Sequence, residues 1–206
     1  MKIIIKDATN DGIVWCGEHN ILANRLRQGL LDCDVITLPD WHAEANKLTI
    51  QNIVNNNLAW SSKLEKVFTL KEQNINSVFS ERKALALLRE PAIHKLLGIS
   101  IHAIASTNMF MSGNIDSDFG YAITLSNPEQ EQYHYSIVEY AQINGMTSNE
   151  AYKQLSLRVE NFQNIRCRIY SYCDYFTNKI NRATDKITID AIMAELLKKF
   201  ISDGQI

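Results

Sequence analysis

The segment Thr147–Arg182 contains neither glycine nor proline, and its apolar residues recur alternately three and four positions apart. Such spacing places one stripe of side chains on a single face of an α-helix. Thr147 and Glu150 match a capping box at the start, because the threonine oxygen can accept from the backbone while the glutamate reaches back to the cap. We therefore predict one uninterrupted helix of about 35 residues, roughly 50 Å long at ~1.5 Å per residue.

The stripe on this helix is apolar except for one arginine. Its members are Tyr152, Leu155, Val159, Phe162, Arg166, Ile169, Cys173, Phe176 and Ile180. A closing helix from Thr188 to about Ser202 can fold back on the long helix but is too short to cover all of it. The rest of the stripe must meet the 127–144 segment, the N-terminal region or another copy of the chain. We predict an interface formed by Leu155, Val159, Phe162, Arg166, Ile169, Phe176 and Ile180.

Arg166 breaks the apolar stripe and has two interpretations. A single polar residue in such a stripe can fix the register or reach a carboxylate across an interface. Alternatively, its long side chain runs along the margin of the stripe to water.

The N-terminal region favours a small β-sheet. Lys2–Asp7 and Ile13–Cys16 flank an Asp-Gly step, which is typical of a β-hairpin. An amphipathic helix is expected within Glu18–Leu31. A third strand is expected over Asp34–Leu38, where Pro39 stops it.

Helices are expected after this sheet. Asp40 can cap a helix that runs through Ile53. The apolar spacing over 61–98 is helical, with a fresh start at Ser80 and another helix that Pro91 opens at its first turn.

The middle of the chain contains the best loop candidate, 112–120, and Tyr121–Leu125 is predicted to form a strand after it. Asn127 and Pro128 then favour the start of a helix that stops at Gly145.

These elements predict an α+β protein that is predominantly α, with a small N-terminal β-sheet and helices followed by a long C-terminal helical hairpin. We expect an α+β N-terminal region over 1–125 and a helical hairpin or bundle over 126–206. With 46% hydrophobic residues, 21% charged residues and a net charge of −2, the composition is that of a soluble globular protein. No stretch approaches the ~20 apolar residues of a membrane span, and Lys6 ends the apolar run near the start, so a cytoplasmic location is expected.

The four cysteines show no Cys-x-x-Cys pair and no regular spacing. Neither a disulfide framework nor a thiolate metal site is therefore indicated, and we expect reduced thiols. Cys16 and His19 could offer two zinc ligands, but no second pair follows them. We predict no metal and no cofactor.

Lysine and arginine are absent between Lys95 and Lys153, although the chain has 21 of them. Six acidic residues give that stretch a charge of −6: Asp116, Asp118, Glu129, Glu131, Glu139 and Glu150. The preceding segment 61–100 has seven cations and four glutamates, a net charge of +3. If the two blocks lie on different faces, copies of the chain or a partner can dock by complementary charge; if they lie side by side, they neutralise each other.

The segment Leu96–Ala105 resembles the centre of a helix-turn-helix, in which Gly98, Ile99 and Ser100 would form the turn and Ala103 and Ile104 would anchor the second helix. The resemblance implies DNA binding, but His94 occupies a position where the family has a small residue. No Lys or Arg follows the expected recognition helix until Lys153, although phosphate contacts supply most of the affinity of such modules. The nucleic-acid-binding candidates in this alternative are Lys83, Arg89, Lys95, Ser100, His102 and Ser106.

A third alternative is an enzyme. Arg89 and His94 match the loose Arg-x4-His pattern of a family of helical ribonucleases, and the resemblance implies that the pair acts on a 2′-OH. Cys16 lies between an expected strand and an expected helix, which is where cysteine hydrolases hold a thiol of lowered pKa. Candidate bases are His42, His94, His102 and His134.

The leading hypothesis is a non-catalytic interaction or assembly protein that forms a homo-oligomer or docks into a larger complex. The uncovered stripe, the charge blocks and the incomplete catalytic motifs favour it. The Ile- and Asn-rich composition suits a low-GC bacterium or its phage, so a phage structural or assembly component falls within this hypothesis. Nucleic acid is the less favoured partner, no membrane partner is expected, and enzymatic activity is left open.

Overall fold

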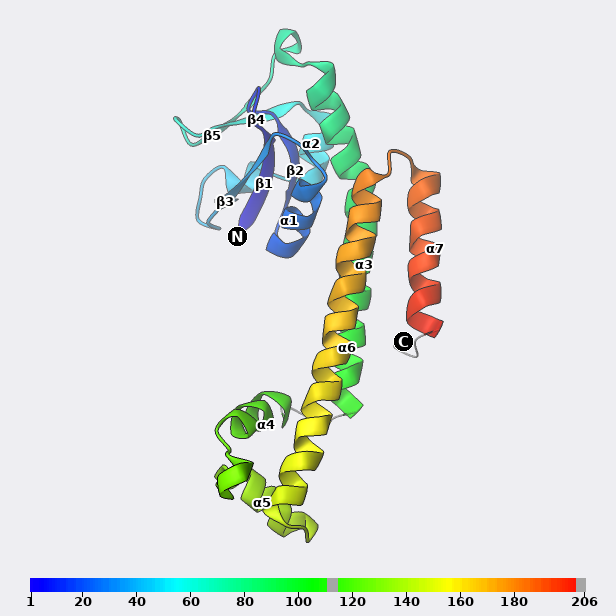
Figure 1. The fold of residues 1–206 in the computed structure, drawn as a ribbon. Coiled ribbons are helices and arrows are strands. Elements are labelled where there is room, and N and C mark those ends of the chain that lie inside the picture. Colours follow the sequence, from blue (N-terminus) through cyan, green and yellow to red (C-terminus); the bar gives the residue numbers. More distant parts are fainter. Residues whose placement is uncertain (111–114, 203–206) are drawn as a thin grey trace. The chain divides into compact units, whose positions relative to one another are not determined.

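The computed structural model describes residues 1–110 and 115–202, with side chains described over 1–106 and 119–200. It confirms an α+β fold that is predominantly α, with a small N-terminal antiparallel sheet and long C-terminal helices (Figure 1). The chain divides into two compact units: unit 1 is Met1–Gly98 with Asp174–Lys199, and unit 2 is Ile99–Cys173 with Phe200–Ile206. The division at 125/126 stays a prediction, because such units do not report which segments fold independently.

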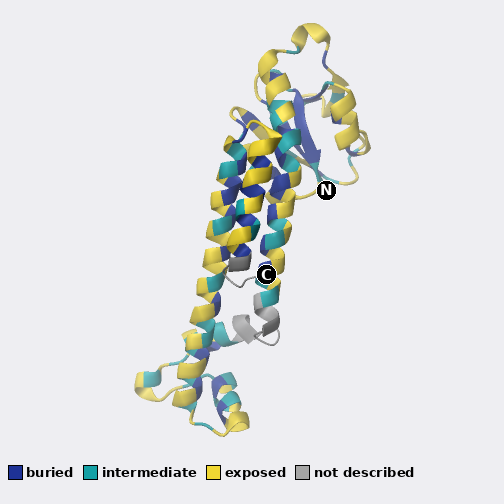
Figure 2. Cartoon of the chain, turned by 90° about the vertical axis from the view of Figure 1, so that its right-hand side faces the viewer, coloured by how far each residue is buried: buried dark blue, intermediate teal, exposed yellow. Residues whose placement is uncertain are grey.

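Three antiparallel strands in the order β2-β1-β3 form the sheet of unit 1, as predicted: β1 (Lys2–Asp7), β2 (Ile13–Gly17) and β3 (Cys33–Leu38). Ile3, Ile4 and Ile5 of the central strand are all fully buried. Successive side chains point to opposite faces of a sheet, so this run shows that both faces are covered. Dark blue strand ribbon is visible in this sheet in Figure 2, in keeping with the burial of β1 and β2.

Short helices flank this sheet. The predicted amphipathic helix is confirmed as α1 (Asn20–Gln28), which buries Leu22, Ala23 and Leu26. The predicted helix from Asp40 is wrong: a 3-10 turn, η1 (Ala45–Lys47), precedes the short helix α2 (Ile50–Asn55). Thr49, not Asp40, caps α2, because its side chain accepts from the backbone N–H of Asn52 at 3.1 Å.

A second hairpin, β4 (Leu58–Ser61) with β5 (Lys66–Thr69), occupies a segment that was predicted to be helical from Ser61. Leu58 and Trp60 pack into the cluster around Ile4 and Cys16, and this burial outweighs the helical spacing. At the outer edge of β5, the Val67 N–H donates a hydrogen bond to the carboxylate of Glu44, at 2.9 Å from Oε2. A single 3-10 turn, η2 (Glu72–Asn74), follows.

One long helix, α3 (Ser77–Phe110), replaces the several helices predicted between 77 and 110. Pro91 lies inside α3, so the prediction that it opens a helix is wrong. Gly98 and Ser100 are also helical, so the helix-turn-helix turn predicted there does not form. Ala92, Ile93 and Leu96 are buried beside Pro91, and this packing offsets the backbone hydrogen bond that proline cannot donate.

Two shorter helices of unit 2 correct the prediction for the middle of the chain. The helix α4 (Ile115–Thr124) lies where a loop to residue 120 and the strand Tyr121–Leu125 were predicted; residues 111–114 lie outside the described part. Pro128 begins only a 3-10 turn, η3 (Pro128–Gln130), and the helix α5 starts later, as Tyr135–Asn144. Its predicted end at Gly145, with φ +65°, is confirmed.

The predicted long helix is confirmed as α6 (Ser148–Arg182), and its capping box is formed. The Glu150 N–H donates to Thr147 Oγ1 at 3.2 Å, and the Thr147 N–H donates to Glu150 Oε2 at 2.8 Å. The closing helix is α7 (Lys186–Ser202). Asp185 caps it by accepting from the Thr188 N–H at 2.8 Å.

Candidate functional site

The predicted interface residues on α6 are mostly core residues of the chain itself. Exposed fractions are 1% for Leu155, 5% for Phe162 and 0% for Ile169, Phe176 and Ile180. Val159 is half-buried and Arg166 is exposed. The argument that this stripe needs an outside partner is therefore wrong, although an interaction of the protein with a partner stays a prediction.

Arg166 is the predicted interface residue that remains available to a partner. Its guanidinium lies over the rings of Phe162 and Tyr170, 5.5 and 5.8 Å from their centroids. The side chain therefore extends along the margin of the stripe, as in the second of its two interpretations.

Two of the nucleic-acid-binding candidates already serve the fold. Arg89 is 3% exposed and donates to the carbonyl oxygens of Gly29 and Ala183 at 2.9–3.1 Å. Lys83 donates to the backbone oxygen of Asn56 at 3.1 Å, and burial lowers its pKa. Ser100 is buried as well, while Lys95 and His102 are exposed and Ser106 is half-buried.

Two side chains on which the enzyme alternatives depend, Arg89 and Cys16, are buried. Arg89 has its guanidinium occupied by carbonyl oxygens, so it cannot serve the ribonuclease role that the resemblance implies. Burial also raises the pKa of Cys16 to about 11, although Lys2 opposes this rise. A thiol that is 1% exposed and protonated at neutral pH is a poor nucleophile.

A pocket of about 370 Å³ lies where β2 ends and α1 begins, and we call it the junction pocket. It brings together two histidines that are far apart in the sequence, His19 at the start of α1 and His94 on α3. Their ring centroids are 5.9 Å apart. Among the described residues, no group of three His, Cys, Asp or Glu side chains could hold a metal ion.

The charged side chains of the junction pocket are Lys2, Glu18 and Glu90. Lys2 Nζ and Glu18 Oε1 form an ion pair at 3.2 Å, whereas Glu90 has no ion-pair partner in the described part of the chain. Leu22, Ile50 and Trp15 supply apolar wall. Sequence reasoning singled out Cys16, His19 and His94 but missed Glu90 and Trp15, because only the folded chain brings α3 beside the end of β2.

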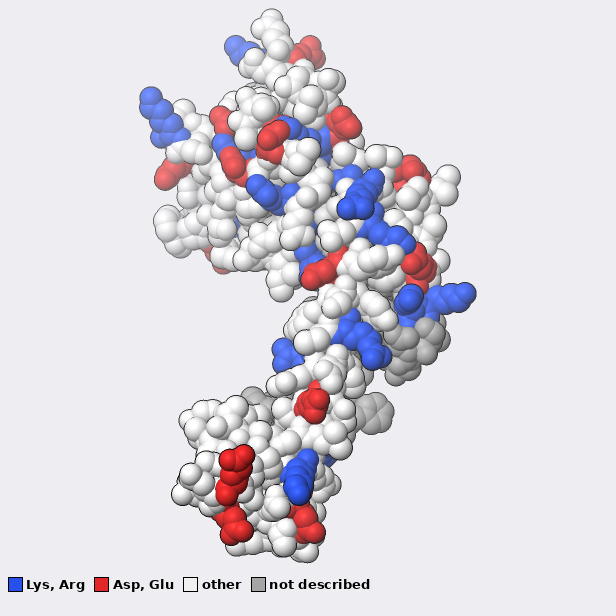
Figure 3. All heavy atoms as spheres, in the orientation of Figure 1, with Lys and Arg blue, Asp and Glu red and all other residues white. Residues whose placement is uncertain are grey.

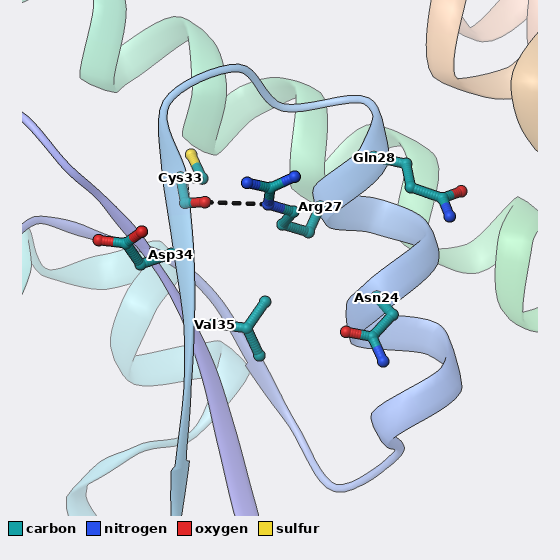
Figure 4. A pocket seen from close by; sticks show the side chains of 6 residues that line it. All are labelled: Asn24, Arg27, Gln28, Cys33, Asp34 and Val35. Carbon is teal, nitrogen blue, oxygen red and sulfur yellow. Dashed lines mark hydrogen bonds between the residues drawn. The ribbon is translucent and has the colours of Figure 1, made fainter.

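A second pocket of unit 1, of about 420 Å³, lies between α1 and β3 (Figure 4). Arg27 Nε donates to the backbone oxygen of Cys33 at 3.0 Å, and Asp34 points to the opposite side of β3 from Arg27. Arg27 and Asp34 are both exposed, so this pocket lacks the buried polar groups that fix a ligand.

Unit 2 exposes Tyr121 and Tyr135 on either side of the half-buried His134, and Leu125 and three glutamates of the same chain segment are exposed as well. We call the exposed residues of this segment, together with His134, the acidic–aromatic surface: Tyr121, Leu125, Glu129, Glu131, His134, Tyr135 and Glu139. The His134 ring lies 6.2 Å from that of Tyr121 and 4.4 Å from that of Tyr135. Tyr121 and Tyr135 are 63% and 73% exposed, and Leu125 is 54% exposed. Large exposed aromatic side chains gathered in one place are typical of interaction surfaces.

The charges that the segment of this surface itself contributes are acidic. The segment 96–152 has no lysine or arginine, so every cation of unit 2 belongs to α6. In Figure 3 the part of unit 2 that carries α4 and α5 shows acidic side chains, and the blue side chains near them belong to α6. Beneath the surface, Ala122, Ile137, Ala141, Ala151 and Leu155 form a buried cluster that holds α4, α5 and α6 together.

No described helix is both long enough and apolar enough to cross a membrane. Comparison with protein-family models, with curated proteins and with solved structures finds no match to this chain.

Proposed function

We propose that the protein is a non-catalytic assembly protein whose acidic–aromatic surface binds a second copy of the chain. The observation that carries this proposal is the exposure of Tyr121 and Tyr135 around His134 in a segment with only acidic charge. Tyrosine favours interfaces because it combines a large apolar ring with a polar end. A partner for this surface should be cationic and should offer apolar or aromatic area.

The same chain offers such a counterpart on α6. Arg166 and Arg168 of α6 are both exposed. Tyr170, one turn further along the same helix, is 46% exposed, and the Arg166 guanidinium lies over its ring. The segment 96–152 has a charge of −6 while the net charge of the whole chain is −2, so the remaining residues carry +4. Copies that join an acidic surface to a cationic one form a heterologous contact, which generates rings or open chains.

The oligomeric state in solution tests the proposal. We expect the molar mass measured by light scattering to exceed that of one chain, and to fall as NaCl rises from about 50 to about 500 mM, because salt screens exposed charges. Tyr121→Ser with Tyr135→Ser should give a monomer at both salt concentrations.

The matched control is Leu31→Ser with Ile187→Ser, which removes two side chains that are 79% and 83% exposed in unit 1. This variant should assemble like the wild type. A wild-type protein that stays monomeric at low salt and high concentration would contradict the proposal.

Such self-assembly would suit a structural or assembly component of a phage. DNA binding stays a prediction. Two of the cations predicted to contact phosphate, Lys83 and Arg89, instead donate hydrogen bonds to backbone carbonyl oxygens of the chain.

A further inference from the structure

We infer that the outer edge of β3 binds an extended peptide of a partner protein, antiparallel to β3, with an acidic side chain of the peptide beside Arg27. The pocket between α1 and β3 would receive that side chain. The exposed lining of this pocket does not hold a small molecule by itself, but a peptide is held by its main chain. The inference is independent of the proposed assembly, because β3 belongs to unit 1 and the acidic–aromatic surface to unit 2.

The outer edge of β3 presents main-chain groups without a partner. The order β2-β1-β3 leaves one side of β3 without a neighbouring strand. The Ala8 N–H donates to the carbonyl of Asp32 at 2.9 Å, so the ladder with β1 uses the even-numbered residues of β3. Val35 and Thr37 therefore point their N–H and C=O groups away from β1. These four groups have no hydrogen-bond partner within the described residues.

This row of groups selects an extended main chain as its partner. Donors and acceptors that alternate along a strand edge are complementary to another strand, which is how peptides add to exposed sheet edges. Arg27 Nε donates to the carbonyl of Cys33 at 3.0 Å and so marks one end of the open row. Val35 and Ile36 are half-buried on opposite faces of β3, so an added strand would also cover apolar area on both faces.

Arg27 favours an acidic side chain on the peptide. Among the described residues Arg27 is exposed and makes no ion pair. A peptide residue opposite Val35 directs its side chain to the face of Val35, which is the face of α1 and Arg27 (Figure 4). A guanidinium binds a carboxylate there by charge-assisted hydrogen bonds. Asp34 points to the other face and does not oppose this contact.

A second copy of β3 fits this edge less well. In any antiparallel register that pairs the open groups, Asp34 of the second copy faces the side away from Arg27, so the arginine gains no carboxylate. When two copies pair about Val35, the two Asp34 side chains become diagonal neighbours of like charge. The charges therefore favour a different segment, in which an acidic residue lies between β-branched ones.

The test is fluorescence anisotropy of a labelled peptide, Lys-Thr-Val-Glu-Val-Thr-Lys, titrated with the full-length protein. We expect saturable binding, and replacing the peptide's Glu by Gln should weaken it about three- to fivefold, because the contact with Arg27 is charge-assisted but exposed. A methyl group on the main-chain nitrogen of the Glu, which faces β3, should weaken binding at least about tenfold. The same methyl group on the following Val, whose N–H faces solvent, should leave binding unchanged.

Variants of the protein locate the peptide. Arg27→Gln should remove the preference for Glu over Gln in the peptide, whereas Lys71→Gln, which removes an exposed cation elsewhere in unit 1, should keep it. Thr37→Pro should weaken binding at least about tenfold and leave the circular dichroism unchanged, because proline is tolerated where an edge-strand N–H faces outward.

Three results would overturn the inference. The first is no saturable binding of the peptide up to about 2 mM protein. The second is equal binding of the peptide that is methylated on the Glu nitrogen. The third is a failure to bind the peptide combined with a molar mass that Thr37→Pro lowers, which would assign the edge to a second copy.

Discussion

Asp7 is fully buried, yet its surroundings favour the ionised carboxylate. Burial raises the pKa of Asp7, but hydrogen bonds from Thr9 and Arg82 together lower it by more, so the pKa lies below its usual value. Arg82 also pairs with Asp32, at 3.1 Å. This network ties the β1–β2 turn to the start of α3, and each buried charge in it has a partner.

Arg82→Gln should lower the free energy of unfolding by about 3–5 kcal/mol, because it leaves the Asp7 carboxylate buried without a cation. Chemical denaturation at pH 7 measures this loss. Lys95→Gln, at an exposed position on the same helix, should change stability by less than about 0.5 kcal/mol.

The same pair predicts the acid behaviour of the wild type. Because the folded-state pKa of Asp7 is lowered, its contribution is complete above the usual pKa of 3.8 and is lost as the pH falls through the lower folded-state value. The difference in stability between wild type and Arg82→Gln should therefore shrink below about pH 4. A difference that stays constant down to pH 2 would contradict this account.

Among the elements, α3 departs furthest from its sequence pattern, and Gly98 provides a direct test of its continuity. A Cβ added at Gly98 meets no atom within 4 Å. In a continuous helix, Gly98→Ala should stabilise the protein by about 0.5–1 kcal/mol, because alanine loses less backbone entropy.

Gly145→Ala is the matched control, since a Cβ there also meets no atom within 4 Å but φ is +65°. That substitution should destabilise the protein, as expected for a left-handed helix end. Thermal unfolding of the two variants separates the effects. Destabilisation by Gly98→Ala would indicate a turn at this position and would restore the helix-turn-helix alternative.

The capping box at the start of α6 makes a separate prediction. Hydrogen bonds from the backbone and side chain of Thr147 lower the pKa of Glu150 below its usual 4.5. Thr147→Ala should raise that pKa towards 4.5, as NMR titration would show, and should lower Tm by about 2–4 °C at pH 7. The Tm difference should diminish as the pH falls through the lowered pKa of the wild-type Glu150 carboxylate. An unchanged Glu150 pKa in the variant would refute this role.

The elements that sequence alone predicted are those whose local signals agree with their packing. The β1–β2 hairpin, α1 and α6 have both the right spacing and the right ends, and the structure confirms them. The β4–β5 hairpin was missed because its strands gain stability from burying Trp60 on a distant cluster, which no local pattern reveals. Pro91 and Gly98 led to wrong predictions because their local signals favour a helix start and a turn. Buried residues next to them stabilise a continuous helix through both positions instead.

The candidate sites were only partly predictable for a related reason. The sequence indicated Cys16 and His94 as chemical groups and the 96–152 segment as acidic. It could not indicate that Glu90 joins His19 in one pocket, or which tyrosines stay exposed, because both depend on contacts between elements far apart in the chain.

For the whole molecule, the proposed contact is heterologous, and mixing two defective variants tests that geometry. Tyr121→Ser with Tyr135→Ser lacks a working acidic–aromatic surface but keeps its arginines. Arg166→Gln with Arg168→Gln lacks the arginines but keeps the surface. Each variant alone should be monomeric, whereas an equimolar mixture should form a dimer that cannot grow, because only one competent contact exists per pair.

Light scattering should then give twice the mass of one chain for the mixture. Circular dichroism of each variant serves as the folding control. A mixture that stays monomeric would exclude the arginines as the counterpart of the acidic–aromatic surface. A dimer of the Arg166→Gln, Arg168→Gln variant by itself would show that the acidic–aromatic surface pairs with its own copy.

The carboxylate of Glu44 at the edge of β5 has a consequence for handling the protein in acid. Hydrogen bonds from Lys47 and from the Val67 N–H lower the pKa of Glu44, so the carboxylate keeps its charge at this strand edge, where a charge opposes strand addition, until the pH falls through that lowered pKa. Glu44→Ala should open the edge at every pH, and turbidity at neutral pH should report the resulting intermolecular β-pairing. We therefore expect the wild type to stay clear at neutral pH and β-pairing between copies of the chain to begin only once Glu44 is protonated.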